Sequence, residues 1–373
     1  MKRPRPSINR RQMFRLRSEA GQALAQPGPG PGERGRASEQ PWYDLVKASR
    51  PAMGSYFEVR VPAHSPGAAD VATRALDVID ALEDQLTVYR DESELSQLNA
   101  RAHLGPVEVE AGLFGLLEQA VAIGNATGGA YDLTAGALSM AWGFFKGPRR
   151  VPDAETLAAA RACTGQHHLC LDPGARTIAF DRAGIVINLG SIGKGYAIDR
   201  AVDVIRAHPW PTGGLVHGGR SSVYALGSPP GHFAGRWPIA LRNPFDPEKP
   251  LGVVRLRNRA LGTSGTSFQR FEVDGKTYGH ILDPRTGAPA DGPASVSVLA
   301  PTAALADALS TAFYLLGTDG AADYIEQHPD VGAIFVQEGR EPDRPRIITL
   351  GLTEFDFERD GDAAGILGSH GDA

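Results

Sequence analysis

The chain has few cysteines. Only Cys163 and Cys170 occur among its 373 residues. They bracket His167 and His168, but this spacing matches none of the common zinc signatures. A zinc site is therefore disfavoured, whereas one disulfide and two free thiols are both compatible with the sequence. A chain of this length can bury a sizeable core without either kind of cross-link.

Long apolar runs and an excess of basic residues are also missing. No run of 18 uncharged apolar residues occurs, so we expect no transmembrane segment. Residues 9–14 contain two adjacent arginines, but the apolar stretch that a signal peptide requires does not follow them. As written, the chain is therefore expected to be cytoplasmic. Its formal net charge is −5, which argues against a nucleic-acid partner.

Charge and composition divide the chain into three parts. Residues 1–41 are rich in Pro and Gly, and the first 18 carry seven Lys or Arg and no acid, which predicts a disordered basic leader. Residues 351–373 carry six acids against one Arg, which predicts a flexible acidic tail. We expect residues 42–350 to form one folded module. Its many glycines and prolines predict frequent turns.

Hydrophobic periodicity predicts an α+β fold with antiparallel-looking strands. Expected helices span residues 70–87, 113–127, 192–207 and 303–316. Expected strands span residues 55–61, 215–217, 222–226, 237–242, 252–257, 271–273 and 295–299, with two more between 169 and 187. Leu169, Cys170 and Leu171 are expected to lie in a buried strand.

The segment 188–195, Asn-Leu-Gly-Ser-Ile-Gly-Lys-Gly, looks like a phosphate-binding loop without matching a known one. It fails both the Walker A spacing and the dinucleotide Gly-x-Gly-x-x-Gly spacing. Glycines nevertheless let backbone N–H groups approach an anion, and the N-terminus of the following helix favours one. Lys194 would add a point charge for a phosphate. The alternative is a Gly-rich turn that packs a helix on a strand.

His280 begins the segment His-Ile-Leu-Asp-Pro-Arg-Thr-Gly, which ends in a tight Asp-Pro-x-x-Gly turn at residues 283–287. Loops at strand ends often carry functional residues. A histidine here suits a general base that works near neutral pH. A structural histidine is the alternative.

Asp307 and Thr311 lie four residues apart in an Ala-rich helix, so their oxygens share one face. A carboxylate in an apolar helix is costly unless it is paired or binds a ligand. Hard oxygen ligands favour Mg²⁺, usually together with substrate phosphates. Helix capping or hydrogen bonding by Asp307 is the alternative. A serine nucleophile at Ser264 is disfavoured, because residues 261–266 lack the Gly-x-Ser-x-Gly spacing.

Taken together, these segments resemble the ApbE family, the FAD:protein FMN transferases. The segments follow the order of the family over about residues 50–335, and the ordered set is specific although each segment alone is weak. The matching segments are residues 53–55, 89–93, 129–134, 188–196, 218–219, 263–265, 280–287 and 306–311.

The resemblance implies a two-lobed α/β module with antiparallel or mixed sheets and a flavin site between the lobes. It implies Mg²⁺-dependent cleavage of FAD, in which FMN moves to a threonine hydroxyl of an acceptor flavoprotein and AMP is released. The partner would be a flavoprotein with a threonine-containing flavinylation motif. Cleavage of FAD by water and non-catalytic FAD binding remain the alternatives. The second is disfavoured because pure binding needs no base.

The resemblance also implies a role for individual residues. Asp307, Thr311 and the backbone carbonyl of Ser191 would hold Mg²⁺, and His280 would take the proton of the threonine hydroxyl. The residues expected to contact FAD are Met53, Tyr89, Ala130, Tyr131, Asp132, Asn188, Lys194 and Leu282.

The chain departs from the family pattern at three points. Arg220 follows Gly218 and Gly219 where many members carry Asp or Asn, so the local electrostatics differ. Ser310 stands where some members have an additional acid, which disfavours a second metal ion. Family members are commonly exported or lipid-anchored, so a periplasmic or membrane-associated location is the alternative to a cytoplasmic one.

Overall fold

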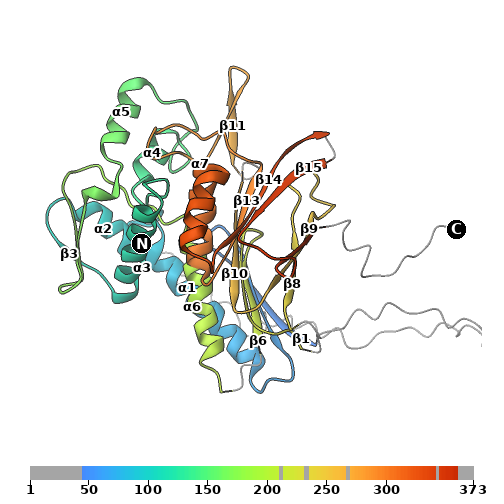
Figure 1. Ribbon diagram of the computed structural model, residues 1–373. Helices are drawn as coiled ribbons and strands as arrows, with labels where there is room; N and C mark the ends of the chain where they lie inside the picture. Colours follow the sequence, from blue (N-terminus) through green and yellow to red (C-terminus); the bar gives the residue numbers. More distant parts are fainter. Residues whose placement is uncertain (1–43, 210–212, 231–234, 266–268, 342–343, 360–373) are drawn as a thin grey trace, which may run out of the picture. The chain divides into compact units, whose positions relative to one another are not determined.

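An antiparallel sheet organises the described part of the chain (Figure 1). The computed structural model describes residues 44–209, 213–230, 235–265, 269–341 and 344–359. The expected leader lies outside these residues, as does the end of the expected tail from residue 360. Among the described residues, no helix is both long and apolar enough to cross a membrane.

The sheet has the strand order β1-β2-β6-β7-β10-β13-β14-β15, and every neighbouring pair is antiparallel. Alternation explains why these segments form strands: in β2, Phe57, Val59 and Val61 are buried while Glu58 and Arg60 between them are half-buried. The strands of this sheet are β1 (Leu45–Ala52), β2 (Ser55–Pro62), β6 (Gly213–Gly218), β7 (Ser222–Gly227), β10 (Arg259–Gly265), β13 (Ser295–Ala300), β14 (Gly332–Glu341) and β15 (Arg344–Leu350).

Each face of the sheet is covered by a different layer. Three helices pack on one face, namely α1 (Ala68–Leu86), α6 (Gly193–Arg206) and α7 (Ala303–Gln327) (Figure 1). A small sheet covers part of the other face through a second apolar core, and its strands are β8 (Trp237–Leu241), β9 (Gly252–Leu256) and β16 (Phe357–Arg359). In α7, Gly317 has a non-helical φ of 70°, so the helix expected over residues 303–316 ends at this break.

A second, mainly helical part lies beyond α1, α6 and α7 as seen from the main sheet (Figure 1). It contains α2 (Glu94–Arg101), α3 (Ala111–Ala126), α4 (Gly136–Ala141), α5 (Ala154–Ala162), a 3₁₀ turn at Gln166–His168 and a small sheet of β3 (Val107–Glu108), β5 (Thr177–Phe180) and β4 (Leu169–Asp172). The hairpin of β11 (Arg270–Val273) and β12 (Lys276–Gly279) packs on α4 through aromatic side chains. The expected α+β class and its antiparallel strands are confirmed.

One end of the main sheet gathers three polar segments. Strand register brings together the β1–β2 turn at Met53–Gly54, the β6–β7 turn at Gly219–Ser221 and the end of β10 at Thr263–Gly265. We call this the site end of the sheet. The three segments are far apart in the chain, so only the strand order makes them neighbours.

Two sequence expectations need correction. The buried strand expected at Leu169–Leu171 is β4, which is an edge strand, so Cys170 is exposed and the two leucines are only half-buried. The folded module does not stop at residue 350, because β16 pairs with β9. Cys163 and Cys170 are both free thiols, which decides between the alternatives left open by the sequence.

Candidate functional site

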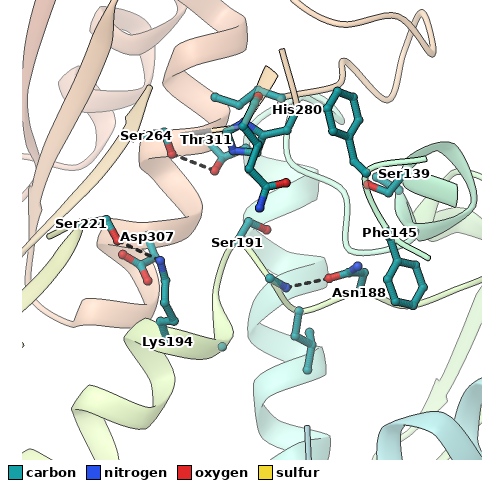
Figure 2. Close-up of a pocket in the computed structure, with 18 of the residues that line it drawn as sticks. Ser139, Phe145, Asn188, Ser191, Lys194, Ser221, Ser264, His280, Asp307 and Thr311 are labelled. Atoms are coloured by element: carbon teal, nitrogen blue, oxygen red, sulfur yellow. Dashed lines mark hydrogen bonds between the residues drawn. The ribbon is translucent and has the colours of Figure 1, made fainter. Parts of the chain in front are cut away.

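A pocket of about 780 Å³ lies between the site end of the sheet and the helical part. All the residues expected to bind FAD, to hold Mg²⁺ or to act as a base line this pocket. They come from segments separated by up to 258 positions, between Met53 and Thr311. Figure 2 shows Asn188, Ser191, Lys194, His280, Asp307 and Thr311 around one space.

Tight turns build the wall of the pocket at the site end. Met53 and Gly54 both have positive φ, at 48° and 68°, and Glu83 from α1 accepts a hydrogen bond from the Met53 amide at 2.9 Å. At Gly219, with φ 65°, a Cβ atom would come within 2.2 Å of the Ser55 hydroxyl. Glycine is therefore needed at this position for the two turns to approach each other.

Asp132 fixes a loop of the opposite wall. Its carboxylate accepts hydrogen bonds from the Thr134 amide (2.8 Å), the Thr134 hydroxyl (2.6 Å) and the Gln166 amide (3.1 Å). Burial raises the pKa of Asp132, which these hydrogen bonds oppose. Its neighbours Ala130 and Tyr131 are almost fully buried. Asp132 therefore holds this loop in shape, and its carboxylate oxygens are already engaged.

The segment 188–195 leads into α6 as expected. The Asn188 side-chain oxygen accepts the Gly190 amide at 2.8 Å, which shapes the turn before the helix. Lys194, in the first turn of α6, donates a hydrogen bond from Nζ to the Ser221 hydroxyl at 2.8 Å. At Gly195 a Cβ atom would come within 2.1 Å of the Ala303 carbonyl oxygen. This close approach of α6 and α7 places Lys194 near Asp307.

Asp307 is a buried carboxylate that is only half satisfied. It is 7% exposed, and its Oδ1 accepts a hydrogen bond from the Ser222 hydroxyl at 2.7 Å. Its Oδ2 is buried without a hydrogen-bond partner among the described residues. Burial raises the pKa of Asp307 to about 6, although the charge of Lys194 and the Ser222 hydrogen bond oppose this shift. An unpaired, buried carboxylate oxygen is a ready ligand for a cation.

A group of hydroxyls lines the same pocket at Ser264, Ser310 and Thr311. Ser264 Oγ lies 2.8 Å from Ser310 Oγ and 3.1 Å from Thr311 Oγ1 (Figure 2). All these donors are hard oxygens, which suit Mg²⁺. In the described ranges, no group of three or more His, Cys, Asp or Glu could form a metal cluster by itself. The residues therefore fit one Mg²⁺ ion that takes its remaining ligands from water and substrate phosphates.

His280 is held through one ring nitrogen, and no residue that the structure describes hydrogen-bonds the other. Its Nδ1 lies 3.2 Å from the Gln269 carbonyl oxygen, which can only accept, so Nδ1 carries the proton and Nε2 has the lone pair. Burial lowers the pKa of His280, and the charges of Lys194 and Arg149 lower it further. The Phe144 ring lies against the imidazole with 6.4 Å between centroids. His280 therefore has a lone pair on Nε2 and a pKa below the ordinary histidine value.

Two of the remaining expected residues differ strongly in exposure. Tyr89 is 68% exposed at the pocket, and its ring meets the Phe145 ring edge-on at a centroid distance of 5.3 Å. Leu282 is buried and forms an isolated bridge with Pro289, which closes the turn after His280. Tyr89 is thus accessible to a planar ligand, whereas Leu282 offers mainly its backbone.

The structure adds residues that the sequence reasoning did not find. Ser222 hydrogen-bonds Asp307 and is an ordinary strand residue that carries no sequence signal. Ser264 hydrogen-bonds Thr311 and lies in the segment 263–265 that resembles the family, but the sequence analysis weighed it only as a nucleophile. Asp199 accepts hydrogen bonds from the Ala303 and Ala304 amides at 2.7 and 2.9 Å, so it caps α7 from α6. The sequence signal for Asp199 is a carboxylate within the apolar face of the helix expected at residues 192–207. Capping, the alternative considered for Asp307, is thus performed by Asp199 and Thr302.

Comparisons with known proteins agree with this site. Residues 53–335 match the model of the ApbE family. An FAD:protein FMN transferase of Treponema pallidum (strain Nichols) is 35% identical over 321 residues, which cover 82% of this chain and 86% of the relative.

Solved structures give the same result. The ApbE protein of Thermotoga maritima matches with 28% identity and a TM-score of 0.73 over 82% of this chain and 97% of its own. The flavin transferase ApbE from Vibrio cholerae matches with 26% identity and a TM-score of 0.71 over 83% of this chain and 97% of its own. Because the match extends over most of this chain and nearly all of these proteins, the chain belongs to the ApbE family.

Proposed function

We propose that this chain is an FAD:protein FMN transferase that uses Mg²⁺, transfers FMN to a threonine hydroxyl of an acceptor flavoprotein and releases AMP. The observation that carries the proposal is that one pocket holds both His280, whose Nδ1 is held by the Gln269 carbonyl, and Asp307, whose Oδ2 has no hydrogen-bond partner among the described residues. The imidazole of His280 can remove a proton from a hydroxyl. The carboxylate of Asp307 can hold a cation that binds phosphate.

FAD would bind along the pocket with its diphosphate at the start of α6. Helix N-termini favour phosphates because their first N–H groups lack partners within the helix. Gly190, Ser191 and Gly193 line the pocket here, and Lys194 adds a positive charge. The exposed ring of Tyr89 would cover a planar part of the ligand, since aromatic faces stack on planar ligands.

Asp307, Thr311 and the Ser191 carbonyl would hold Mg²⁺. When bound, this ion would neutralise part of the diphosphate charge and polarise the P–O bonds. Ser222 keeps Asp307 in place through its 2.7 Å hydrogen bond, and Ser264 does the same for Thr311 at 3.1 Å. Lys194 favours the ionised form of Asp307, which is the form that binds metal.

His280 would accept the proton of the attacking threonine. Its free Nε2 takes the proton from the hydroxyl as the threonine oxygen bonds to the FMN phosphorus. The bond between that phosphorus and the bridging oxygen breaks, and AMP leaves with the electron pair. The Gln269 carbonyl, 3.2 Å from Nδ1, then stabilises the imidazolium ion, because Nδ1–H remains a donor throughout.

Mass spectrometry of an acceptor peptide tests the proposed function. The protein is incubated with FAD, Mg²⁺ and a threonine-bearing peptide, and in parallel with the same peptide carrying valine in place of threonine. We expect the threonine peptide alone to gain one FMN, and chelation of Mg²⁺ to prevent the gain. Release of FMN and AMP with no modified peptide would instead indicate hydrolysis. FAD that stays intact would indicate that the protein binds FAD without cleaving it.

A further inference from the structure

Arg220 is a cation of the pocket that the function proposed above does not use. It lines the pocket from the β6–β7 turn and is exposed. Its guanidinium makes no hydrogen bond or ion pair with any residue that the structure describes. Lys194, by contrast, donates to the Ser221 hydroxyl. An unpaired guanidinium in a pocket is available to an anionic ligand, and it suits phosphate because its donors form a rigid fork.

The backbone that carries Arg220 is held on both sides. The Gly219 amide donates to the Tyr56 carbonyl of β2 at 2.6 Å, and the Thr263 amide of β10 donates to the Ser221 carbonyl at 2.7 Å. Gly219 itself has φ 65° and lies against Ser55. The turn is therefore fixed between two neighbouring strands, and only the side chain of Arg220 is free to move. An anion that binds here therefore has to order the side chain of Arg220 but not its backbone.

Strand order sets the position of Arg220 relative to the base. The β6–β7 turn lies between β2 and β10 at the site end. Ser264 in β10 contacts Thr311, and Gln269, which follows β10, holds His280. In strand order, the Ser264 hydroxyl at the end of β10 therefore lies between Gln269, which holds His280, and the β6–β7 turn that carries Ser221 and Arg220.

This order matters because phosphoryl transfer is in line. The attacking and leaving oxygens stand on opposite sides of the phosphorus. If the threonine approaches from the side of His280, the leaving group departs on the side away from His280. The leaving group is AMP. Its phosphate carries about one negative charge within FAD and nearly two after cleavage, since the second pKa of a phosphate monoester is about 6.

We propose that Arg220 binds the phosphate of the AMP half of FAD and stabilises the charge that this phosphate gains as AMP departs. This inference rests on the proposed function for its catalytic part only. A guanidinium that meets growing charge contributes more in the transition state than in the ground state, so it raises kcat as well as affinity. The ligand class is a nucleoside monophosphate, recognised through its phosphate.

Binding measurements on the full chain test the phosphate contact. The wild type, Arg220→Ala and Arg220→Lys are titrated calorimetrically with AMP, adenosine and FMN. We expect Arg220→Ala to weaken AMP binding at least about tenfold, as for a lost charge-assisted hydrogen bond. Adenosine and FMN should bind as before, and lysine should restore part of the AMP affinity. Arg74→Ala is the matched control, because Arg74 is an exposed arginine on α1 that pairs with Asp70 away from the pocket.

Several results would overturn the inference. Unchanged AMP affinity in Arg220→Ala would remove the contact. An equal loss of affinity for AMP and adenosine would indicate a structural effect. A larger loss of affinity for FMN than for AMP would show that Arg220 contacts the FMN phosphate instead.

Transfer kinetics separate this inference from the proposed function. With saturating FAD, Arg220→Ala should lower kcat at least about tenfold, whereas a kcat equal to that of the wild type would contradict stabilisation of the leaving group. If the wild type binds AMP through Arg220 but modifies no peptide, the proposed function fails and the phosphate site stands.

Discussion

Gly195 lies where α6 and α7 touch backbone to backbone, so adding a single methyl group there tests how the site is held. In Gly195→Ala the new Cβ would lie 2.1 Å from the Ala303 carbonyl oxygen, about 1.3 Å short of the 3.4 Å of an ordinary contact. The atoms it meets belong to the backbone of α7 and cannot rotate away. The two helices would therefore have to move apart by about 1 Å.

The expected cost follows from this clash. Overpacking a well-packed contact costs about 1–3 kcal/mol, and the better helix propensity of alanine returns about 1 kcal/mol. We expect a net loss of about 0–2 kcal/mol in the free energy of unfolding. The effect on activity should be larger. Lys194 precedes Gly195 and Asp307 lies one turn beyond Ala303, and a displacement of about 1 Å in a catalytic site can cost about 100-fold in rate.

Gly115→Ala provides the control. Gly115 is exposed in α3, and a Cβ atom there would meet nothing within 4 Å. This change should raise the free energy of unfolding by up to about 1 kcal/mol and leave transfer unaltered. Denaturant titration and the peptide-modification rate measure both effects. If Gly195→Ala were as stable and active as Gly115→Ala, the close packing of α6 on α7 could not be what positions Lys194 and Asp307.

Three further changes address the chemistry. His280→Ala should lower kcat by about 10²- to 10⁴-fold, as for a lost general base, without changing the affinity for FAD. Calorimetry with FAD measures the affinity, and a kcat equal to that of the wild type would remove His280 from the mechanism. Ser222→Ala should weaken Mg²⁺ binding about 10- to 100-fold, because it removes the hydrogen bond to Asp307 Oδ1. The transfer rate measured against Mg²⁺ concentration tests this, and an unchanged half-saturating Mg²⁺ concentration would contradict it. As pH falls through about 6, the transfer rate should drop because Asp307, whose pKa is raised to about 6, becomes protonated. More Mg²⁺ should move this limb of the pH profile to lower pH, since metal and proton compete, whereas a limb insensitive to Mg²⁺ would argue against Asp307 as a ligand.

Local patterns in the sequence predicted the elements with strong periodicity. The alternation at residues 55–61 and the helical spacing at 70–87 correspond to β2 and α1. β10 was not found as a strand, because its glycines and hydroxyl residues at 262–265 look like a polar loop. Its small residues are explained by packing, since a Cβ on Gly262 would come within 2.6 Å of the Asp307 amide nitrogen. The need for small residues at this contact depends on α7, which is distant in the chain.

The composition of the site was predictable, whereas its geometry was not. The resemblance indicated His280 and Asp307, and both line the pocket. Which ring nitrogen of His280 is free depends on the carbonyl of Gln269, and the half-satisfied state of Asp307 depends on Ser222. Both partners are ordinary residues that the strand order brings into contact. The placement of the turn of Arg220 beside β10 likewise follows from strand order, which a single sequence does not reveal.

The ratio of AMP to modified peptide tests the central claim most directly. Both products are quantified during a single incubation of the wild type with FAD, Mg²⁺ and the threonine peptide, and fragmentation of the peptide locates the phosphoester. Transfer predicts one AMP for each FMN on the threonine oxygen, with both lost together in His280→Ala. AMP formed without modified peptide, or FMN found on another residue, would contradict transfer of FMN to threonine.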